Sequence, residues 1–558
     1  MVFFESAKEN LAKTRTLFLR VVSISYCMGF VSLYTQIRGL YSADGILPVS
    51  EHVRSSSWEE LSANPHLLWV ASKIGLTVDL WMEVLCLLGG MIGLLASLFP
   101  ALGNKVSFIF LWLAYISMYS VGQTFLWFQW DILLLETGFL AILASPFNAK
   151  KYWKPKPRDH ICMMLVRWLL FRMMFASGVV KLQSMCPTWW GLTAMPTHYE
   201  SQCIPTPLAW YAYNVQGEGT ILQKLSVVVT YITEIPLTLF FFAPTKTLRK
   251  ISFAFQIQLM IAIMLTGNYN FFNLLYIGLC VSLMDDSWMR RNKDDLQVTN
   301  NSNRSSKVAD IIGNAINFVF IGALVYYTFI YFVTFENGSV DVSVKFTKKE
   351  FDWFISDVGT PYGIILGGAA LTFSFVISLW KSIVPSEENE ELSIKTKLWN
   401  SLSTILHGAI ALFIFGISLS VFTRGVQQNV PSFASSLTNQ PMIRQGANMN
   451  HNLQLVSSYG LFRRMTGVGG RPEVIIEGSM SETGPWKEYE FLYKPGNLTT
   501  APRFCLPHQP RLDWQMWFAA LGHYQHNPWI ISLAYRILQG RFFILMILVL
   551  CQVWNNLF

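Results

Sequence analysis

Long apolar runs recur along most of this 558-residue chain and predict membrane-spanning helices. A helix needs roughly 20 apolar residues to cross the hydrocarbon core of a bilayer. Runs of this kind lie near 17–37, 74–99, 106–127, 129–147, 161–181, 221–243, 251–267, 270–284, 311–335, 361–380 and 401–422. The pattern therefore predicts an α-helical polytopic membrane protein with about 11 spans, in which the short seventh and eighth runs form a tilted or re-entrant pair.

The pattern changes after Thr423. Residues 424–452 are polar without a strong period, and short β-prone runs follow, separated by Gly, Pro and Ser. The stretch "RLDWQMWFAAL" (511–521) then predicts an aromatic-rich amphipathic helix. We expect a small lumenal β-rich C-terminal domain here. The predicted organisation is an N-terminal multi-span membrane domain (1–285), a cytosolic linker (286–310), further spans (311–423), the β-rich domain (424–540) and an apolar tail (541–558).

Basic residues set the predicted sidedness. Lys8, Lys13, Arg15 and Arg20 lie before or at the start of the first span, and no small-residue cleavage motif follows a short apolar core, which predicts a signal anchor with a cytosolic N-terminus. Eleven spans then put the loops 150–158, 245–250 and 285–295, each of which contains Lys or Arg residues, in the cytosol, in agreement with the positive-inside rule. The segments predicted to face the other side are 38–66, 182–220, 336–360 and everything after 424.

Composition agrees with this class and narrows the partners. Hydrophobic residues make up 52% of the chain and charged residues only 14%, whereas a soluble domain usually has about a quarter charged residues. The net charge of +8 raises the question of a nucleic-acid partner. Because Lys and Arg lie mainly in short loops beside apolar runs, we expect no nucleic acid and take the lipid bilayer as the partner of these loops.

Glycosylation sequons divide according to this sidedness. Asn337 ("NGS") and Asn497 ("NLT") fall on the lumenal side, where the sugar transferase acts, and are the glycosylation candidates. Asn300 and Asn303 fall on the cytosolic side and should stay unmodified. Asn497 is the better candidate because Asn337 lies close to the predicted membrane.

Charged residues inside the predicted spans have two interpretations, a proton- or cation-coupled site or salt bridges between helices. They are Asp79, Glu83, Asp131, Glu136, Arg167, Arg172, Lys181 and Glu234. The near balance of acids and bases favours salt bridges, because a coupled transporter would keep an unpaired acid near the midplane. Asp131 is expected at the lumenal interface. Glu136 lies deeper and needs a buried partner, either Arg172 or Arg167.

The predicted lumenal loop 182–220 contains polar groups that suggest chemistry. Cys186 and Cys203 could form a structural disulfide worth roughly 3 kcal/mol, which we favour over a thiol pair that exchanges with client disulfides because they lack CxxC spacing. His198 or Glu200 could act as a general base, but no nucleophile, metal or phosphate-loop motif accompanies them. We therefore favour an aromatic loop lying on the membrane and expect no catalytic residue, metal or cofactor.

Five longer stretches carry a resemblance to a known family. They are "QIRGLYSADGILP" (36–48), "FQWDILLLETGFLAI" (128–142), "HYESQCIPTPLAWY" (198–211), "TGNYNFFNLL" (266–275) and "RLDWQMWFAALG" (511–522). Together they resemble the lipase maturation factors, multi-pass proteins of the endoplasmic reticulum, over nearly all of the chain to about residue 540. The stretch at 458–479 is most similar to the type 2 branch of that family.

The resemblance implies a folding factor rather than an enzyme. Its implied partners are secreted client proteins, homodimeric lipases in the family, and client binding is implied for the lumenal C-terminal region. Trp210, Trp514 and Trp517 are the candidate client contacts, with packing or membrane anchoring as the alternative role of each. The first half also resembles, more distantly, the membrane domain of vitamin K-dependent carboxylase. This keeps a membrane-embedded enzyme acting on a lipid or polypeptide as an alternative, and an ion-coupled transporter that uses Asp131 and Glu136 is a third possibility.

The final 18 residues depart from the expected family pattern. That pattern would continue as a soluble helix, whereas "RFFILMILVLCQVWNNLF" (541–558) is apolar enough for a short further span or an alternative terminus.

Overall fold

The computed structural model describes residues 10–51, 53, 66–147, 153–216, 219–289, 304–336, 338–384 and 393–541. Helices dominate this part of the chain, as the apolar runs predict, and eight helical segments are long and apolar enough to cross a membrane. These are α2 (Ala12–Tyr34), α6 (Val78–Leu98), α10 (Asp159–Gln183), Ile221–Phe242, α16 (Lys246–Thr266), Asp310–Phe332, Lys348–Ile383 and α21 (Ile394–Gly425).

Three of these segments correspond to more than one element or to part of one. Ile221–Phe242 comprises α14 (Ile221–Glu234), α15 (Pro236–Leu239) and a 3-10 turn (Phe240–Phe242), because Pro236 has no N–H to continue α14. Asp310–Phe332 is the apolar part of α18 (Arg304–Phe332). Lys348–Ile383 joins α19 (Lys348–Trp353), a π-helical turn (Phe354–Gly359) and α20 (Thr360–Ile383).

The predicted count of eleven spans is not confirmed. The runs at 106–127, 129–147 and 270–284 form α7 (Lys105–Val121), α9 (Gln129–Ala144) and α17 (Phe272–Cys280), which have 17, 16 and 9 residues. At 1.5 Å per residue, even 17 residues reach only about 25 Å, less than the roughly 30 Å hydrocarbon core. Gly122 and the left-handed Gln123 (φ 44°) end α7, a break that mean hydropathy does not register.

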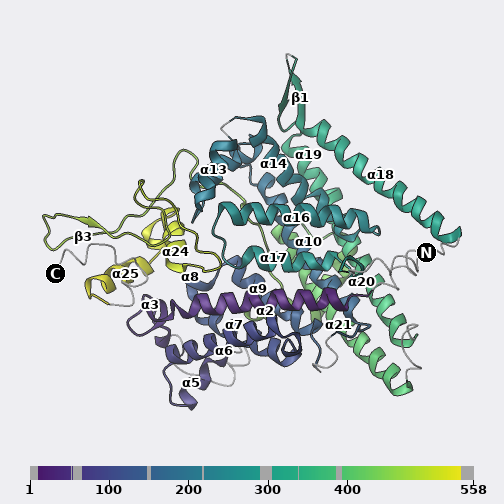
Figure 1. The fold of residues 1–558 in the computed structure, drawn as a ribbon, viewed down its shortest axis with the longest axis horizontal. Helices are drawn as coiled ribbons and strands as arrows, with labels where there is room; N and C mark the ends of the chain where they lie inside the picture. Colours follow the sequence, from purple (N-terminus) through teal and green to yellow (C-terminus); the bar gives the residue numbers. More distant parts are fainter. Residues whose placement is uncertain are drawn as a thin grey trace.

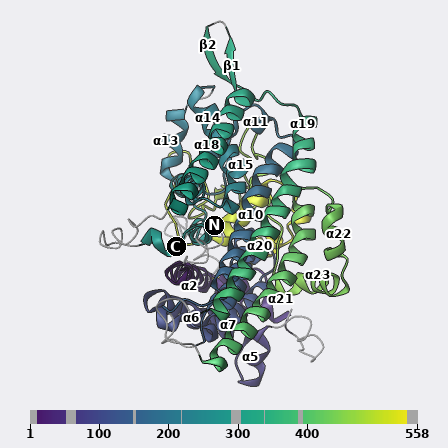
Figure 2. The same ribbon diagram turned by 90° about the vertical axis from the view of Figure 1, so that its right-hand side faces the viewer.

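The remaining elements are short. The helices are α3 (Ile37–Tyr41), α5 (Val70–Lys73), α8 (Gln123–Leu126), α11 (Pro187–Trp190), α12 (Ala194–Ser201), α13 (Pro207–Gln216), α22 (Ser432–Thr438), α23 (Pro441–Leu453), α24 (Arg511–Ala520) and α25 (Trp529–Leu538). The strands β1 (Val333–Glu336) and β2 (Ser339–Val342) form an antiparallel hairpin in which Val333 pairs with Val342. This hairpin projects from the helix bundle in Figures 1 and 2.

Helix α10 lies at the centre of the bundle. Its most apolar window is 94% buried, and it packs against α9, α14, α17, α20 and α21. Helix α18 is at the opposite extreme, because only 6% of its window is buried, and it runs along the edge of the bundle in Figure 1. The central position of α10 explains why its charged residues need partners from the protein itself.

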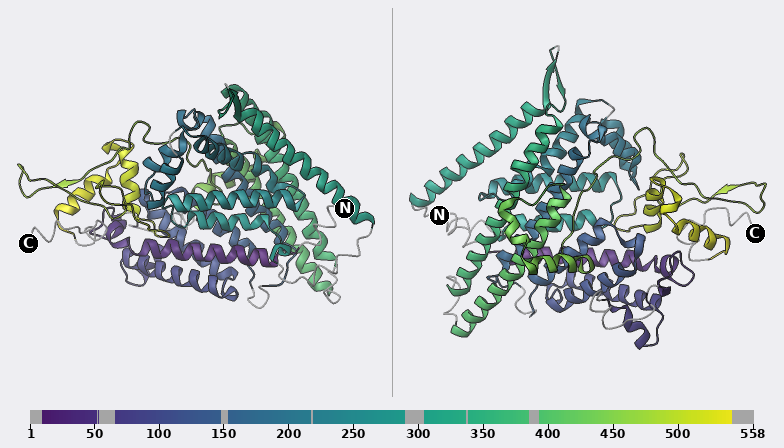
Figure 3. Two further views of the ribbon diagram at one scale, coloured as in Figure 1. Left: turned by 45° about the horizontal axis from the view of Figure 1, so that its top comes forward. Right: turned by 180° about the vertical axis from the view of Figure 1, so that it is seen from behind.

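The C-terminal segment, defined as residues 454–541, gathers at one end of the bundle in both views of Figure 3. The prediction of a β-rich domain is wrong in its secondary structure: within the described residues after 424 the strands are only β3 (Glu477–Gly478) and β4 (Lys487–Glu488). Much of 454–510 is extended without forming strands, because several of its backbone groups bond to side chains of the membrane half. The proposed domain boundaries stay a prediction.

Segments predicted for one side of the membrane meet in the structure. The first turns of α2 and α10 are joined by a buried ion pair between Arg15 and Asp159 (2.5 Å). The backbone N–H of Thr14 donates to Oδ1 of Asp286 (2.9 Å), which brings the predicted cytosolic loop at 285–289 to the same place. Two of the predicted lumenal segments, 38–66 and 182–220, contact the C-terminal segment: Ser532 donates to the Ile46 carbonyl (2.6 Å) and Trp189 to the Phe462 carbonyl (2.9 Å).

Candidate functional site

The first contact between the membrane helices and the C-terminal segment is a buried cluster around Glu136. Arg172 of α10 forms an ion pair with Oε1 of Glu136 on α9, and both side chains are almost completely buried. Oε2 of Glu136 accepts hydrogen bonds from the Ser457 backbone N–H (2.9 Å) and the Tyr459 hydroxyl (2.7 Å). Arg172 in turn donates to the Ser457 carbonyl (3.1 Å). One intramembrane ion pair therefore holds the start of the C-terminal segment.

Of the two partners considered for Glu136, the structure places Arg172 there. Arg167 donates instead to the Ser282 carbonyl (3.1 Å from Nε). A second ion pair lies about two and a half helical turns further along α10, where Lys181 pairs with Glu234 of α14 (2.6 Å). Lys181 also donates to the Leu461 carbonyl (3.2 Å), so this pair too binds the C-terminal segment.

Asp131 is the centre of another buried contact and is itself fully buried, so the expectation that only Glu136 is buried is wrong, whereas its position at the lumenal interface stays a prediction. Arg511 at the start of α24 donates from Nη1 and Nη2 to the two Asp131 oxygens (3.1 and 2.9 Å), and both side chains are fully buried. The Tyr115 hydroxyl adds a bond of 2.5 Å, and Arg511 also donates to the Phe125 carbonyl (2.6 Å). A bidentate guanidinium offsets the desolvation of a buried carboxylate in this geometry.

The Asn-rich turn 267–270 has a role that sequence reasoning missed. It is capped as expected, since Oδ1 of Asn270 accepts from the Phe272 N–H (2.9 Å). Asn268, however, binds the C-terminal segment on both sides of its amide. It donates to the Arg503 carbonyl (2.9 Å) and accepts from the Cys505 N–H (2.9 Å). The sequence held one clue to this role: among the described residues of the turn, Asn270 alone caps it, so the side chain of Asn268 needed a partner elsewhere.

Arg471 extends the contact to the loop that precedes α13. Its guanidinium donates to the carbonyls of Gln202 and Cys203 (3.1 Å for the latter) and pairs with Glu473 (2.6 Å). Lys494 binds the second oxygen of Glu473 (2.7 Å). On the other flank, the Ser32 hydroxyl of α2 accepts from the Gln509 N–H (2.9 Å), and Gln36 accepts from the Arg511 N–H (2.8 Å).

These contacts draw on all five stretches that carry the family resemblance. Gln36, Asp131, Glu136, Gln202, Asn268 and Arg511 come from regions of the sequence as far as 475 residues apart. Their shared effect is to build the C-terminal segment into the end of the bundle. The acids therefore act as partners in ion pairs, which fits the salt-bridge interpretation of the intramembrane charges.

The three Trp candidates for client contact differ in exposure. Trp514 is only 4% exposed and packs against Trp130 (ring centroids 4.7 Å apart), so in this conformation its role is packing. Trp517 is partly buried and donates to the Ser201 carbonyl (2.9 Å). Trp210 on α13 is 63% exposed. Of the three Trp side chains, only Trp210 is exposed at the surface.

Helix α25 is a further exposed apolar element that sequence reasoning missed. Trp529, Leu533 and Ile537 face the protein and are buried, whereas Tyr535 and Leu538 are exposed. The helical spacing of the buried residues was visible in "WIISLAYRIL", which is apolar on more than one face. The exposed residues of α25 are therefore available for contact with a partner.

The candidate polar groups of the 182–220 loop include His198, Cys186 and Cys203. His198 is buried, and burial together with the nearby Lys181 charge lowers its pKa to about 4, so it is neutral at pH 7. Within the described residues, the one hydrogen-bond contact of the His198 imidazole is the Tyr269 hydroxyl at 3.5 Å. Cys186 and Cys203 are both free thiols, so the predicted disulfide is not formed in the structure. In the part of the chain that the structure describes, no three His, Cys, Asp or Glu residues are grouped as metal ligands.

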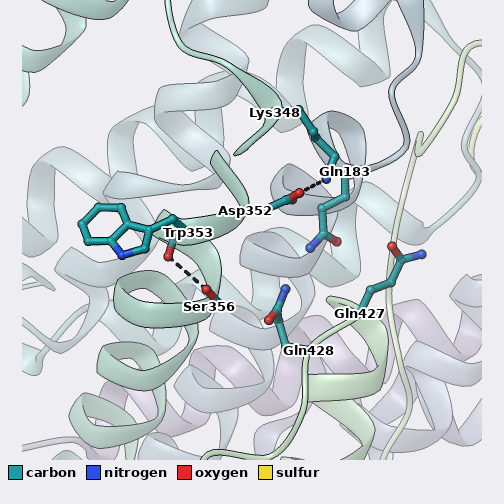
Figure 4. A pocket seen from close by; sticks show the side chains of 7 residues that line it. All are labelled: Gln183, Lys348, Asp352, Trp353, Ser356, Gln427 and Gln428. Atoms are coloured by element: carbon teal, nitrogen blue, oxygen red, sulfur yellow. Dashed lines mark hydrogen bonds and ion pairs between the residues drawn. The ribbon is translucent and has the colours of Figure 1, made fainter. Parts of the chain in front are cut away.

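A polar hollow of about 350 Å³ lies beside the start of α19. Figure 4 shows the amide groups of Gln183 and Gln428 turned toward each other, while the indole ring of Trp353 points away from them. Lys348 and Asp352 form an ion pair on its rim. Ser356 also lines the hollow, and its hydroxyl donates to the Trp353 carbonyl and the Asp357 carboxylate.

Of the two glycosylation candidates, the structure describes one. Asn497 is exposed in a turn, where its side-chain oxygen accepts from the Thr499 hydroxyl (2.8 Å) and N–H (2.9 Å). Asn337 lies outside the described residues, as do Asn300 and Asn303.

The long apolar helices and buried interhelical ion pairs define a polytopic helical membrane protein whose C-terminal segment is built into the end of its bundle. Family models agree with both parts: the lipase maturation factor transmembrane domain matches residues 13–291, and the lipase maturation factor C-terminal domain matches residues 455–553. The second match includes most of the tail at 541–558.

Individual relatives cover almost the whole chain. Lipase maturation factor 2 of Xenopus tropicalis is 44% identical over 538 residues, which are 94% of this chain and 73% of the relative. The human protein of the same name is 41% identical over 544 residues, 94% of this chain and 74% of the relative. Lipase maturation factor 1 of Mus musculus is 25% identical over 541 residues, 94% of this chain and 77% of the relative. No solved structure matches.

The chain therefore belongs to the lipase maturation factor family, and it is most similar to the type 2 branch. Its role is that of a membrane maturation factor.

Proposed function

We propose that this protein assists the maturation of secreted proteins in the membrane of the endoplasmic reticulum, with homodimeric lipases as the clients. The name of its relatives supports a lipase client. A lumenal position of the C-terminal segment is supported by the basic loops 150–158 and 245–250, which the positive-inside rule assigns to the opposite side.

The mechanism we propose is binding without chemistry. The observation that carries it is the way in which the C-terminal segment is held. Two buried ion pairs of the membrane half bind this segment and a third joins Arg511 of the segment to Asp131, while α25 leaves apolar side chains exposed on it. A partly folded client exposes apolar surface, which such side chains cover. Rigid anchoring limits the conformational entropy that the binding surface loses when a client docks.

A rescue experiment tests the proposal. Cells that lack the protein should synthesise a homodimeric lipase normally but secrete less active enzyme, and the wild-type chain should restore activity. We expect Trp210→Ala to restore less, because it removes an exposed indole ring from the 182–220 loop. Trp153→Ala is the matched control, since Trp153 is similarly exposed (58% against 63%) but lies in a predicted cytosolic loop.

Two results would count against the proposal. Normal secretion of active lipase in the knockout would remove lipases as clients. Equal loss of rescue with Trp210→Ala and Trp153→Ala, at equal protein levels, would mean that exposed aromatic rings act through membrane anchoring or stability. Crosslinking of lumenal clients to the wild-type chain, followed by capture of the complex, identifies the clients directly.

The exposed Asn497 gives an independent test of the location. A sugar on this residue that endoglycosidase H removes would place the C-terminal segment in the lumen and the protein in the endoplasmic reticulum.

A further inference from the structure

A cavity of about 300 Å³ opens between α14 and α16, at the level of the Lys181–Glu234 ion pair. Its walls are mostly apolar: Leu225 and Val229 come from α14, Leu259 and Ile263 from α16, and Phe462 from the C-terminal segment, with Ser226 and Gln258 as polar neighbours. Its volume lies at the lower end of the range of small-molecule sites, about 300–1,000 Å³. The cavity is therefore large enough for part of an amphipathic molecule.

The mouth of the cavity faces the surface that these two spans turn toward lipid. Leu222, Leu225 and Val229 on α14 are 53, 41 and 37% exposed, and Ile261 and Leu265 on α16 are 47 and 49% exposed. Exposed apolar side chains on two candidate spans are typical of a lipid-facing surface. A molecule dissolved in the bilayer can thus enter from the side without crossing water.

The floor of the cavity is polar but has no net charge to offer. Lys181 and Glu234 neutralise each other, and His198, with a pKa of about 4, is neutral at pH 7. A phosphate or free carboxylate placed here would lose its hydration without gaining an unpaired cation, which is costly in an apolar site. The floor therefore selects an uncharged headgroup.

The floor also selects a hydrogen-bond donor. The Lys181 ammonium has three N–H donors, and they are used by the Ser177 carbonyl (3.2 Å), Glu234 Oε2 (2.6 Å) and the Leu461 carbonyl (3.2 Å). The hydroxyls of Thr230 and Thr233 donate to main-chain carbonyls one turn earlier. Among the described residues, Oε1 of Glu234 accepts no hydrogen bond, although Glu234 lines the cavity.

We propose that this cavity binds an uncharged membrane lipid that carries a free hydroxyl headgroup. The hydroxyl donates to Oε1 of Glu234, and the hydrocarbon chain lies between α14 and α16 and extends toward the bilayer. The ligand class includes monoacylglycerols, long-chain alcohols and other hydroxyl-bearing neutral lipids. The wall formed by Phe462 makes the C-terminal segment part of the site, because Leu461 and Phe462 are held by Lys181 and Trp189.

Binding of radiolabelled monooleoylglycerol to the purified full chain in phosphatidylcholine nanodiscs tests the proposal. We expect saturable binding that oleyl alcohol displaces. Methyl oleate has the same chain without a hydroxyl donor, and oleate has a charged headgroup, so both should compete at least about tenfold more weakly, the effect of losing one good hydrogen bond to a charged group. Non-saturable binding, or equal displacement by methyl oleate and oleyl alcohol, would overturn the proposal.

Variants locate the site. Leu259→Trp should fill the cavity and weaken binding by about tenfold or more, whereas Ile261→Trp adds the same ring to the lipid-facing side of α16 outside the cavity and should leave binding unchanged. Val229→Phe fills the cavity from α14 and replaces Leu259→Trp if that variant does not yield a monodisperse protein. Wild-type affinity in the folded filling variants would refute the assignment. No client takes part in this assay, so its outcome is independent of the lipase proposal.

Discussion

The ion pair between Asp131 and Arg511 offers the sharpest test of how the C-terminal segment is held. Arg511→Met removes the guanidinium that donates to both Asp131 oxygens and to the Phe125 carbonyl. Asp131 is then left with the Tyr115 hydroxyl as its remaining side-chain partner. Since both side chains are fully buried, breaking the pair should cost about 3–5 kcal/mol, the range for an uncompensated buried charge.

Hydrogen exchange followed by mass spectrometry measures this loss where it acts. The amides of Cys505, Gln509 and Arg511 donate to side chains of the membrane half, so their exchange reports the opening of the contact. A loss of about 3–5 kcal/mol should speed exchange of these amides by roughly a hundredfold to a few thousandfold, because every 1.4 kcal/mol is a factor of ten.

Two further variants separate charge burial from general damage. Asp131→Asn combined with Arg511→Met removes both charges and should recover most of the protection, because neutral partners of similar size often replace a buried ion pair without loss. Lys348→Met breaks an ion pair whose side chains are 34 and 43% exposed. It should change the free energy of opening at these amides by at most about 1 kcal/mol. The reasoning is refuted if Arg511→Met behaves like Lys348→Met, or if the double variant exchanges as fast as the single one.

Three other predictions follow from single residues. Asn268→Ala should lower the free energy of opening at the Cys505 amide by about 1–3 kcal/mol and so speed its exchange, since it leaves that N–H without its partner; unchanged exchange would refute this role. Asn497→Gln should abolish a glycosidase-sensitive mass shift, whereas retention of the shift would assign the sugar elsewhere. Burial raises the pKa of Asp513 to about 6, so the folded state binds this proton more tightly than the unfolded state; the resulting stability is present below about pH 4 and is lost as the pH rises through 6. Asp513→Asn should flatten this dependence in melting curves, and an unchanged profile would contradict it.

Rules about charge at bilayer depth anticipated part of the site. An acid in the middle of an apolar run must find a partner, and this alone led from Glu136 to Arg172 as one of two candidates on a neighbouring helix. The same rule did not identify the partner of Asp131. Arg511 follows it by 380 residues, and a local pattern cannot show that such a distant side chain enters the bundle.

The extended run after residue 454 shows a second limit of pattern reasoning. Alternation and β-prone residues correctly indicate extended backbone, but they do not show which groups satisfy its hydrogen bonds. In the structure, Ser457 and Cys505 donate to the side chains of Glu136 and Asn268 instead of to neighbouring strands. Hydropathy averages likewise predicted full spans where the structure has the shorter helices α7 and α9. An average does not register a chain break such as the one at the left-handed Gln123, which ends α7.

The distribution of buried partners implies that the two halves of this protein complete each other. Without the C-terminal segment, Glu136 keeps Arg172, but Asp131 loses its cation, and burial of an unpaired carboxylate is strongly unfavourable. The segment without the membrane half has few strands of its own to satisfy its backbone. Its client-binding role, as proposed, therefore depends on the membrane helices for its shape. The contact that gives Asp131 its counter-charge joins residues 380 positions apart, and contacts of such long sequence separation are costly in loop-closure entropy.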